Sequence, residues 1–155
     1  MKLVKNFPLD TAVLKELFSD PEDLSLVWPV AHWLFDHEQW QQVLDSGKDA
    51  ISFLVHEGEI LIGHAALDRA ENPATRMVRF LYIAPEHRSR GAGQRMIALL
   101  EEYARDRLGA KRLELKVRSF NNRAMRCYEK CGFTEFFRKD TLVMMGKDIR
   151  NLKEV

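Results

Sequence analysis

The sequence has little cysteine, almost no net charge and no long apolar run. Its two cysteines, Cys127 and Cys131, are too few for a disulfide scaffold or a closed zinc site, so a reducing cytoplasm is the expected location. Lysine and arginine number 24 against 23 aspartates and glutamates, a formal net charge of +1. A nearly neutral chain has no global field that attracts nucleic acid or an anionic membrane, so we expect neither as a partner.

Export signals, membrane spans, repeats and linkers are missing as well. The first eight residues hold no apolar stretch of signal-peptide length, and Pro29 and His32 interrupt the aromatic-rich run 26–35. No Pro/Gly/Ser-rich segment divides the chain. With 155 residues, 46% of them hydrophobic and 30% charged, the sequence predicts one folded domain over residues 1–155.

The hydrophobic pattern alternates between strand and helix signals. Glu57-Gly58 is a hairpin signal, so the strands on either side of it should be antiparallel. The expected strands are 2–6, 51–56, 59–67, 77–84, 113–117, 133–138 and 141–149, and the expected helices are 11–19, 28–44, 96–108 and one from Asn121 to Gly132. This order predicts an α/β (α+β) domain with a mixed, mostly antiparallel sheet of six to seven strands and about four helices.

A glycine-containing segment, residues 88–95, follows the strand 77–84 and opens the helix 96–108. A helix start exposes unpaired N–H groups and a partial positive charge, and glycines let a phosphate approach the backbone. The segment is thus a candidate pyrophosphate site, or else a turn followed by solvated arginines. A Rossmann loop would need a third glycine where Met96 stands, and the Gly-Lys-Ser/Thr ending of a Walker loop is absent.

Two motifs in this part of the chain resemble the GCN5-related N-acetyltransferase (GNAT) family. The first is a strand and loop, Leu81-Tyr82-Ile83-Ala84-Pro85 followed by Arg88-x-x-Gly91-x-Gly93. The second, in register after it, comprises Leu115-x-Val117, Asn121, Ala124, Tyr128 and Gly132-Phe133. The resemblance spans roughly residues 51 to 149 and implies a GNAT-like fold that binds acetyl-CoA as co-substrate and acetylates a primary amine.

The resemblance also implies roles for individual residues. Backbone groups of the strand end would bind the pantetheine arm and the thioester carbonyl, the amides of the loop would bind the pyrophosphate, and Asn121 would contact the pantetheine arm or only cap its helix. The cofactor-binding residues expected on this basis are Leu81, Tyr82, Ile83, Arg88, Ser89, Arg90, Gly91, Ala92, Gly93, Gln94 and Asn121.

Tyr128 would act as general acid on the departing sulfur, either by giving its proton or by a hydrogen bond to the thiolate; otherwise it packs in the core. Its neighbour Cys127 could suggest a covalent acyl intermediate, but no activating histidine pattern accompanies it. We therefore interpret Cys127 as a half-buried structural thiol and expect the amine to attack directly in a ternary complex.

The general base is the point at which the sequence departs from the family. Many members carry a glutamate on the strand before the Leu-Tyr pair, whereas 75–80 here contains no acid. His64 and Glu114 are the candidate bases, directly or through water, and the alternative for each is a sheet or surface residue. Arg76 and Arg79 could instead bind an acidic group on the acceptor, or be solvated strand residues.

Residues 1–50 are expected to form the acceptor side, and residues 51–150 the cofactor-binding core. The aromatic-rich region of the first part would line the acceptor pocket or pack in the core; it contains Trp28, His32, Trp33, Phe35 and Trp40. The acceptor would be a small-molecule or peptide amine, and the protein a monomer or homodimer. A non-catalytic acyl-CoA sensor of the same fold is the alternative function, supported by the missing strand acid.

Overall fold

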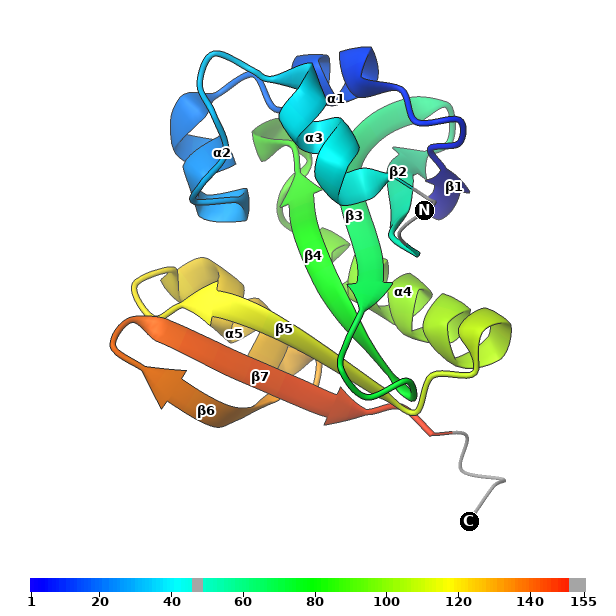
Figure 1. Ribbon diagram of the computed structural model, residues 1–155, viewed down its shortest axis with the longest axis vertical. Helices are drawn as coiled ribbons and strands as arrows, with labels where there is room; N and C mark the ends of the chain where they lie inside the picture. Colours follow the sequence, from blue (N-terminus) through cyan, green and yellow to red (C-terminus); the bar gives the residue numbers. More distant parts are fainter. Residues whose placement is uncertain (46–48, 151–155) are drawn as a thin grey trace.

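A seven-stranded sheet with helices on both faces forms the body of the computed structural model, which describes residues 1–45 and 49–150 (Figure 1). The strands are β1 (Lys2–Lys5), β2 (Ile51–Glu57), β3 (Ile60–Arg69), β4 (Thr75–Ile83), β5 (Arg112–Arg118), β6 (Thr134–Lys139) and β7 (Leu142–Asp148). The α-helices are α1 (Thr11–Leu17), α2 (Pro21–Val27), α3 (His37–Leu44), α4 (Ala92–Leu108) and α5 (Asn122–Lys130), and a 3₁₀ turn, η2, covers Pro85–His87. The expected mixed sheet is confirmed, and the described residues form five α-helices instead of about four.

The sheet order is β1-β2-β3-β4-β5-β7-β6, and every neighbouring pair is antiparallel except β4 and β5. The parallel pair is short: only Thr75, Arg76 and Met77 of β4 have partners on β5. Beyond Met77 the two strands diverge, β4 running up and β5 across the view of Figure 1. The backbone of β4 from Val78 to Ile83 therefore has no strand partner on its β5 side.

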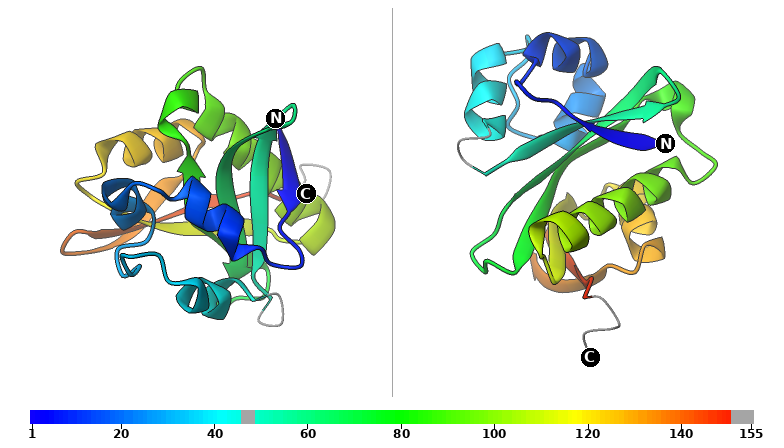
Figure 2. Two further views of the ribbon diagram at one scale, coloured as in Figure 1. Left: turned by 90° about the horizontal axis from the view of Figure 1, so that it is seen from above. Right: turned by 90° about the vertical axis from the view of Figure 1, so that its right-hand side faces the viewer.

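Two hydrophobic cores lie on opposite faces of the sheet (Figure 2). One, beneath α4 and α5, takes alternate residues of β5 and β7; the other, the N-terminal core, packs the first three helices on β3 and β4. Its rings stack closely, with the Trp40 ring centroid 5.0 Å from that of Phe18 and 4.8 Å from that of Trp28. The aromatic residues of the first part of the chain thus contribute mainly to folding.

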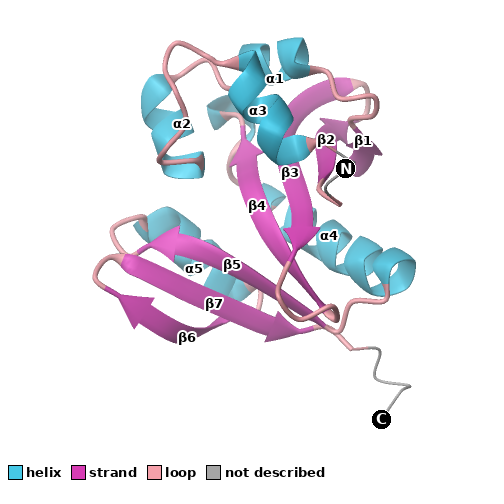
Figure 3. Ribbon diagram, in the orientation of Figure 1, coloured by secondary structure: helices cyan, strands magenta, loops and turns pink. Residues whose placement is uncertain are grey.

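The helix expected over residues 28–44 is wrong over its first half, because residues 28–36 are irregular and only α3 (His37–Leu44) is helical, while a separate helix, α2, ends just before Trp28 (Figure 3). Asp20 caps α2, with Pro21 in the first turn, and Asp36 caps α3 through the Gln39 amide. An aspartate at an N-cap followed by proline is a standard helix start, so the sequence contained the signal for two helices. Trp33, expected on the helix, lies between them and is half exposed.

Within residues 1–45 and 49–150, none of the helices has the length and hydrophobicity that a membrane span requires.

Candidate functional site

The divergence of β4 and β5 opens a cavity of about 770 Å³ between the strands. Its walls come from the end of α2, from β3, β4 and β5, from the loop before α4, and from α5. Of the residues expected to bind cofactor, Leu81, Tyr82, Ile83, Arg88, Ser89, Gly91, Ala92, Gly93, Gln94 and Asn121 line this cavity. Arg90 instead lines a separate hollow beside Arg95 and Glu57.

The loop before α4 is shaped for an anion. Ser89, Arg90 and Gly91 all have positive φ, at 106°, 56° and 73°, so the chain turns sharply into the helix. Gly91 is the N-cap, and no side chain caps α4. The Ala92 amide donates to the Ser89 carbonyl at 3.2 Å, whereas the next two amides, of Gly93 and Gln94, have no acceptor among the described residues. These two N–H groups lie at the cavity wall, where the dipole of a 17-residue helix favours negative charge.

Arg88 links α2 to the end of β4, a structural role that sequence analysis did not predict. Its guanidinium donates from Nε to the Ile83 carbonyl at 2.7 Å and from Nη2 to Asp23 Oδ2 at 2.9 Å. Asp23, on α2, also accepts a hydrogen bond from the Tyr82 hydroxyl at 3.2 Å. Burial raises the pKa of Tyr82 to about 12, and the Asp23 carboxylate adds to that shift, so the phenol stays protonated. These contacts tie α2 to the end of β4 and to the loop.

A bulge in β4 lies at the centre of the cavity wall. His64 pairs with Tyr82 and Ala66 with Arg79, so β4 contains one more residue than β3 over this stretch. Phe80, in the bulge, has φ 53°, a conformation that costs free energy in a bulky residue. Bulges are common beside active sites because they redirect backbone groups, here on the unpaired β5 side of β4.

His64, a candidate base, holds this bulge from within the sheet. It is fully buried; its Nδ1–H donates to the Phe80 carbonyl at 2.9 Å, and its Nε2 accepts from the Ser52 hydroxyl at 2.8 Å. Burial lowers its pKa from 6.5 to about 4, although the bond to the Phe80 carbonyl opposes the shift. Both nitrogens are engaged and the residue does not line the cavity, so any proton transfer from an acceptor would need intervening groups.

The low pKa of His64 predicts acid-sensitive folding. The unfolded chain binds this proton below about pH 6.5 and the folded chain only near pH 4, so the free energy of unfolding falls as pH decreases through this window. From about pH 7.5 to about pH 5 we expect this group to contribute a loss of about 2 kcal/mol, measured by urea unfolding. A His64→Gln variant should lose this part of the pH dependence; an unchanged slope would contradict the assignment.

Glu114, the other candidate base, lies at the closed end of the split. It pairs in register with Met77, where β4 and β5 still meet, and its carboxylate accepts from Arg112 Nε at 2.8 Å. It does not line the cavity. Neither candidate base is therefore in direct reach of the space between the strands.

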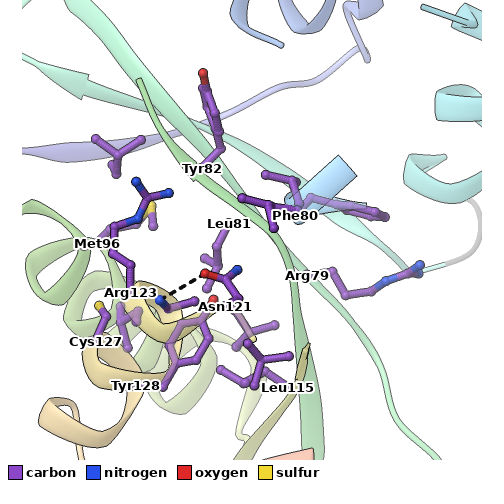
Figure 4. Close-up of a pocket in the computed structure, with 18 of the residues that line it drawn as sticks. Arg79, Phe80, Leu81, Tyr82, Met96, Leu115, Asn121, Arg123, Cys127 and Tyr128 are labelled. Atoms are coloured by element: carbon purple, nitrogen blue, oxygen red, sulfur yellow. Dashed lines mark hydrogen bonds between the residues drawn. The ribbon is translucent and has the colours of Figure 1, made fainter. Parts of the chain in front are cut away.

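Tyr128 and Asn121 project from α5 toward the cavity (Figure 4). Asn121 caps its helix as expected, its Oδ1 accepting from the Ala124 amide at 3.3 Å. The Tyr128 hydroxyl has no hydrogen-bond partner within the described part of the chain. Burial, with a further contribution from the neighbouring thiols of Cys127 and Cys131, raises the Tyr128 pKa above that of a free phenol, so it remains a proton donor.

Cys127 also lines the cavity, where its sulfur packs against the loop. A Cβ placed on Gly93 would lie 3.1 Å from Cys127 Sγ, so glycine permits this close approach of α5. A hydrogen bond from Cys131, one turn later, lowers the pKa of Cys127 to about 7, and Lys130 adds to the shift. The thiol is half-buried, as expected, but more acidic than the absence of a histidine pattern suggested.

Of the aromatic residues expected at the acceptor pocket, only Trp28 lines the cavity. Trp40 is fully buried in the N-terminal core, Phe35 stacks on it, and His32 and Trp33 face solvent. The cavity wall also contains two ion-paired carboxylates that sequence analysis missed, Asp23 and Asp68. Their partners lie 65 and 11 residues away, and no local motif indicates such contacts.

Solved structures of acetyltransferases share this architecture. The Campylobacter jejuni N-acetyltransferase PseH, in complex with acetyl coenzyme A, has a TM-score of 0.71 at 19% identity, covering 95% of this chain and 97% of that one. The spermidine N-acetyltransferase of Vibrio cholerae, in complex with CoA and spermine, gives 0.74 at 20% identity, with 95% and 94% covered. The ribosomal-protein-alanine N-acetyltransferase of Brucella melitensis gives 0.70 at 20%, with 96% and 99% covered.

No curated protein sequence matches the chain. The model of the acetyltransferase (GNAT) family, however, matches residues 12–133, more than half of its length and including the split between β4 and β5, the glycine loop and α5. The chain therefore belongs to the acetyltransferase (GNAT) family.

Proposed function

We propose that this protein transfers the acetyl group of acetyl-CoA to a primary amine by direct attack within a ternary complex. The observation that carries the proposal is the cavity between β4 and β5, which joins an unpaired strand edge, an uncapped helix start and a protonated tyrosine in one space. An extended pantetheine arm can pair with such an edge, and a pyrophosphate suits such a helix start.

The backbone of β4 would supply the electrostatic part of catalysis. In acyl transfer the carbonyl oxygen gains negative charge as the amine adds, and fixed N–H donors stabilise that charge. The bulge at Phe80, held by His64, redirects amides near Leu81 on the unpaired side of β4. We assign the oxyanion contact to this segment of β4, and the pyrophosphate contacts to the amides of residues 88–94.

In the proposed acetyl transfer, one bond forms as another breaks, and the protons that move can be assigned to groups of the protein or to water. The nitrogen lone pair forms the new C–N bond, the C–S bond breaks, and the thiolate receives a hydrogen bond or a proton from Tyr128. The amine loses one proton, for which His64 and Glu114 could act only through intervening groups such as water, since neither lines the cavity. Cys127 is not needed, because the acceptor attacks the thioester directly.

We propose a single domain in which residues 1–50 form the acceptor side and residues 51–150 the cofactor-binding core, acting as a monomer or homodimer. The two free thiols, Cys127 and Cys131, fit the reducing cytoplasm expected from the sequence.

Calorimetric titration with acetyl-CoA, with NAD and ATP as comparison ligands, tests the donor site, and release of CoA with a panel of amines tests catalysis. Selective micromolar binding of acetyl-CoA together with amine-dependent CoA release is the expected result. Binding without turnover on any amine would favour the acyl-CoA sensor. Absence of binding at millimolar acetyl-CoA would refute the proposal.

A further inference from the structure

The cavity has a second side, facing away from α4 and α5, where an acceptor would enter. Side chains alternate along a strand, and on β5 Leu115 and Val117 are buried in the core beneath α4 and α5. Lys116 and Arg118, between and after them, therefore face the opposite way, and both line the cavity. In Figure 4, Arg79 likewise extends from β4 away from Asn121 and Tyr128. We call this the acceptor face, defined by Arg79, Lys116 and Arg118.

The carboxylates of the cavity wall are already neutralised. Among the described residues that line the cavity, Asp23 and Asp68 are the only acids. Asp23 Oδ2 is bound by Arg88 at 2.9 Å and by the Tyr82 hydroxyl, and its side chain is only 15% exposed. Asp68 Oδ2 is bound by Arg79 at 2.8 Å. Neither has a free charge with which to hold a cationic chain.

The cations of the acceptor face, by contrast, retain capacity for an anion. Arg79 is bound to Asp68 through Nη1 alone, its guanidinium lies 4.5 Å from the Phe80 ring centroid, and its side chain is 35% exposed. Arg118 donates to the Thr141 hydroxyl, and no carboxylate in the described part of the chain pairs with it or with Lys116. Positive charge therefore exceeds negative charge on this face.

The cofactor phosphates do not require these three cations. Their expected site is the uncapped start of α4, on the other side of β4, and α5 places Arg123, Arg126 and Lys130 on the cavity wall as well. The acceptor face can therefore serve the second substrate.

We infer that the acceptor is a small primary amine that also carries an anionic group, a carboxylate or a phosphate, and that Arg79 and Arg118, with Lys116, bind that group. This inference rests on the proposed function. Guanidinium groups match the geometry of carboxylate and phosphate, and a polyamine would meet repulsion on this face. Arg79 and Arg118 are thus specificity-determining residues.

Acceptor pairs that differ only in the anionic group test the inference. We would compare kcat/KM for tyrosine with tyramine, lysine with cadaverine, and glucosamine 6-phosphate with glucosamine, with spermidine as the cationic comparator. We expect the anionic member of at least one pair to be favoured at least about tenfold, and the preferred pair to identify carboxylate or phosphate. This preference should weaken as salt concentration rises.

Variants then locate the contact. Arg79→Gln should raise the KM for the anionic acceptor about tenfold and leave the Kd for acetyl-CoA unchanged. Arg118→Gln, which removes a partly exposed side chain bonded to Thr141, provides the same test if the first variant folds poorly. Arg138→Gln is the matched control, since Arg138 pairs with Glu135 on β6 and does not line the cavity.

Three outcomes would overturn the inference: preference for the uncharged or cationic member of each pair, no acetylation of any member, or an unchanged KM for the anionic acceptor in both arginine variants. The proposed function fails separately, by absence of acetyl-CoA binding in the unmodified protein.

Discussion

Replacing Tyr128 with phenylalanine is expected to lower kcat about 100-fold, because the departing sulfur loses its hydrogen-bond or proton donor. The ring remains, so its packing against the core below α5 and its 6.2 Å contact with the Phe133 ring should persist. The Kd for acetyl-CoA should therefore stay within about twofold of that of the unmodified protein. The rate of CoA release at saturating substrate concentrations measures the loss in kcat.

The pH profile of the wild-type enzyme provides a second readout of Tyr128. Burial raises the pKa of this phenol above its usual value near 10, so the proton is present throughout the neutral and mildly alkaline range. No alkaline decline in kcat below about pH 10 should come from this residue. An unaltered kcat in Tyr128→Phe would remove the general-acid role altogether.

Tyr103→Phe is the matched control for this experiment. Tyr103 lies on α4, with its ring 4.9 Å from that of Phe53, and does not line the cavity.

Cys127→Ser separates the two routes of acyl transfer: direct attack predicts that kcat is largely retained, whereas a covalent acyl intermediate predicts that it is abolished.

Replacing Gly91 with valine should weaken acetyl-CoA binding at least about 100-fold, since loss of two charge-assisted hydrogen bonds costs about 3 kcal/mol. Gly91 has φ 73° at the start of α4, and a β-branched residue does not tolerate this conformation. The loop would have to rearrange, and the free amides would leave the cavity wall. Calorimetry with acetyl-CoA measures the effect directly.

The other end of the same helix offers a control with the same backbone strain. Gly109 caps α4 with φ 66° and ψ 21°, close to the φ 73° and ψ 22° of Gly91, and an added Cβ there meets nothing within 4 Å. Gly109→Val should reduce stability in a similar way and leave the Kd unchanged. Equal loss of affinity in both variants would mean that the effect is one of folding rather than of the loop.

The end of β4, the glycine loop and the cap of α5 were predictable because their signals are local. The strand end Leu81-Tyr82-Ile83, the loop to Gly93 and the Asn121 cap are set by backbone conformation and helix starts, which short sequence patterns specify. Asn121 indeed caps α5, and Gly91 adopts the left-handed conformation that only glycine takes readily.

The contacts around Asp23 and His64 could not be predicted from the sequence, since they join distant segments. Nothing local shows that Asp23 will meet Arg88, or that His64 will be enclosed between Ser52 and Phe80. A histidine on a strand has the same appearance in sequence whether it faces solvent or the interior of the sheet. Tertiary packing decides its burial, and burial then decides its pKa.

Because β4 and β5 diverge beyond Met77, the sheet has two unpaired edges in its interior, one on each of these strands, in addition to the outer edges at β1 and β6. Unpaired strand edges are normally a liability, because they can recruit another chain. Here the gap is bounded by α2 and by the loop before α4, which leaves room for a slender ligand. An acetyl donor bound there would occupy the position that a further strand would take between β4 and β5. At a free concentration of a hundred times its Kd, the donor would add about 2.7 kcal/mol to the free energy of unfolding. Resistance to heat and to proteases should therefore depend on cofactor supply.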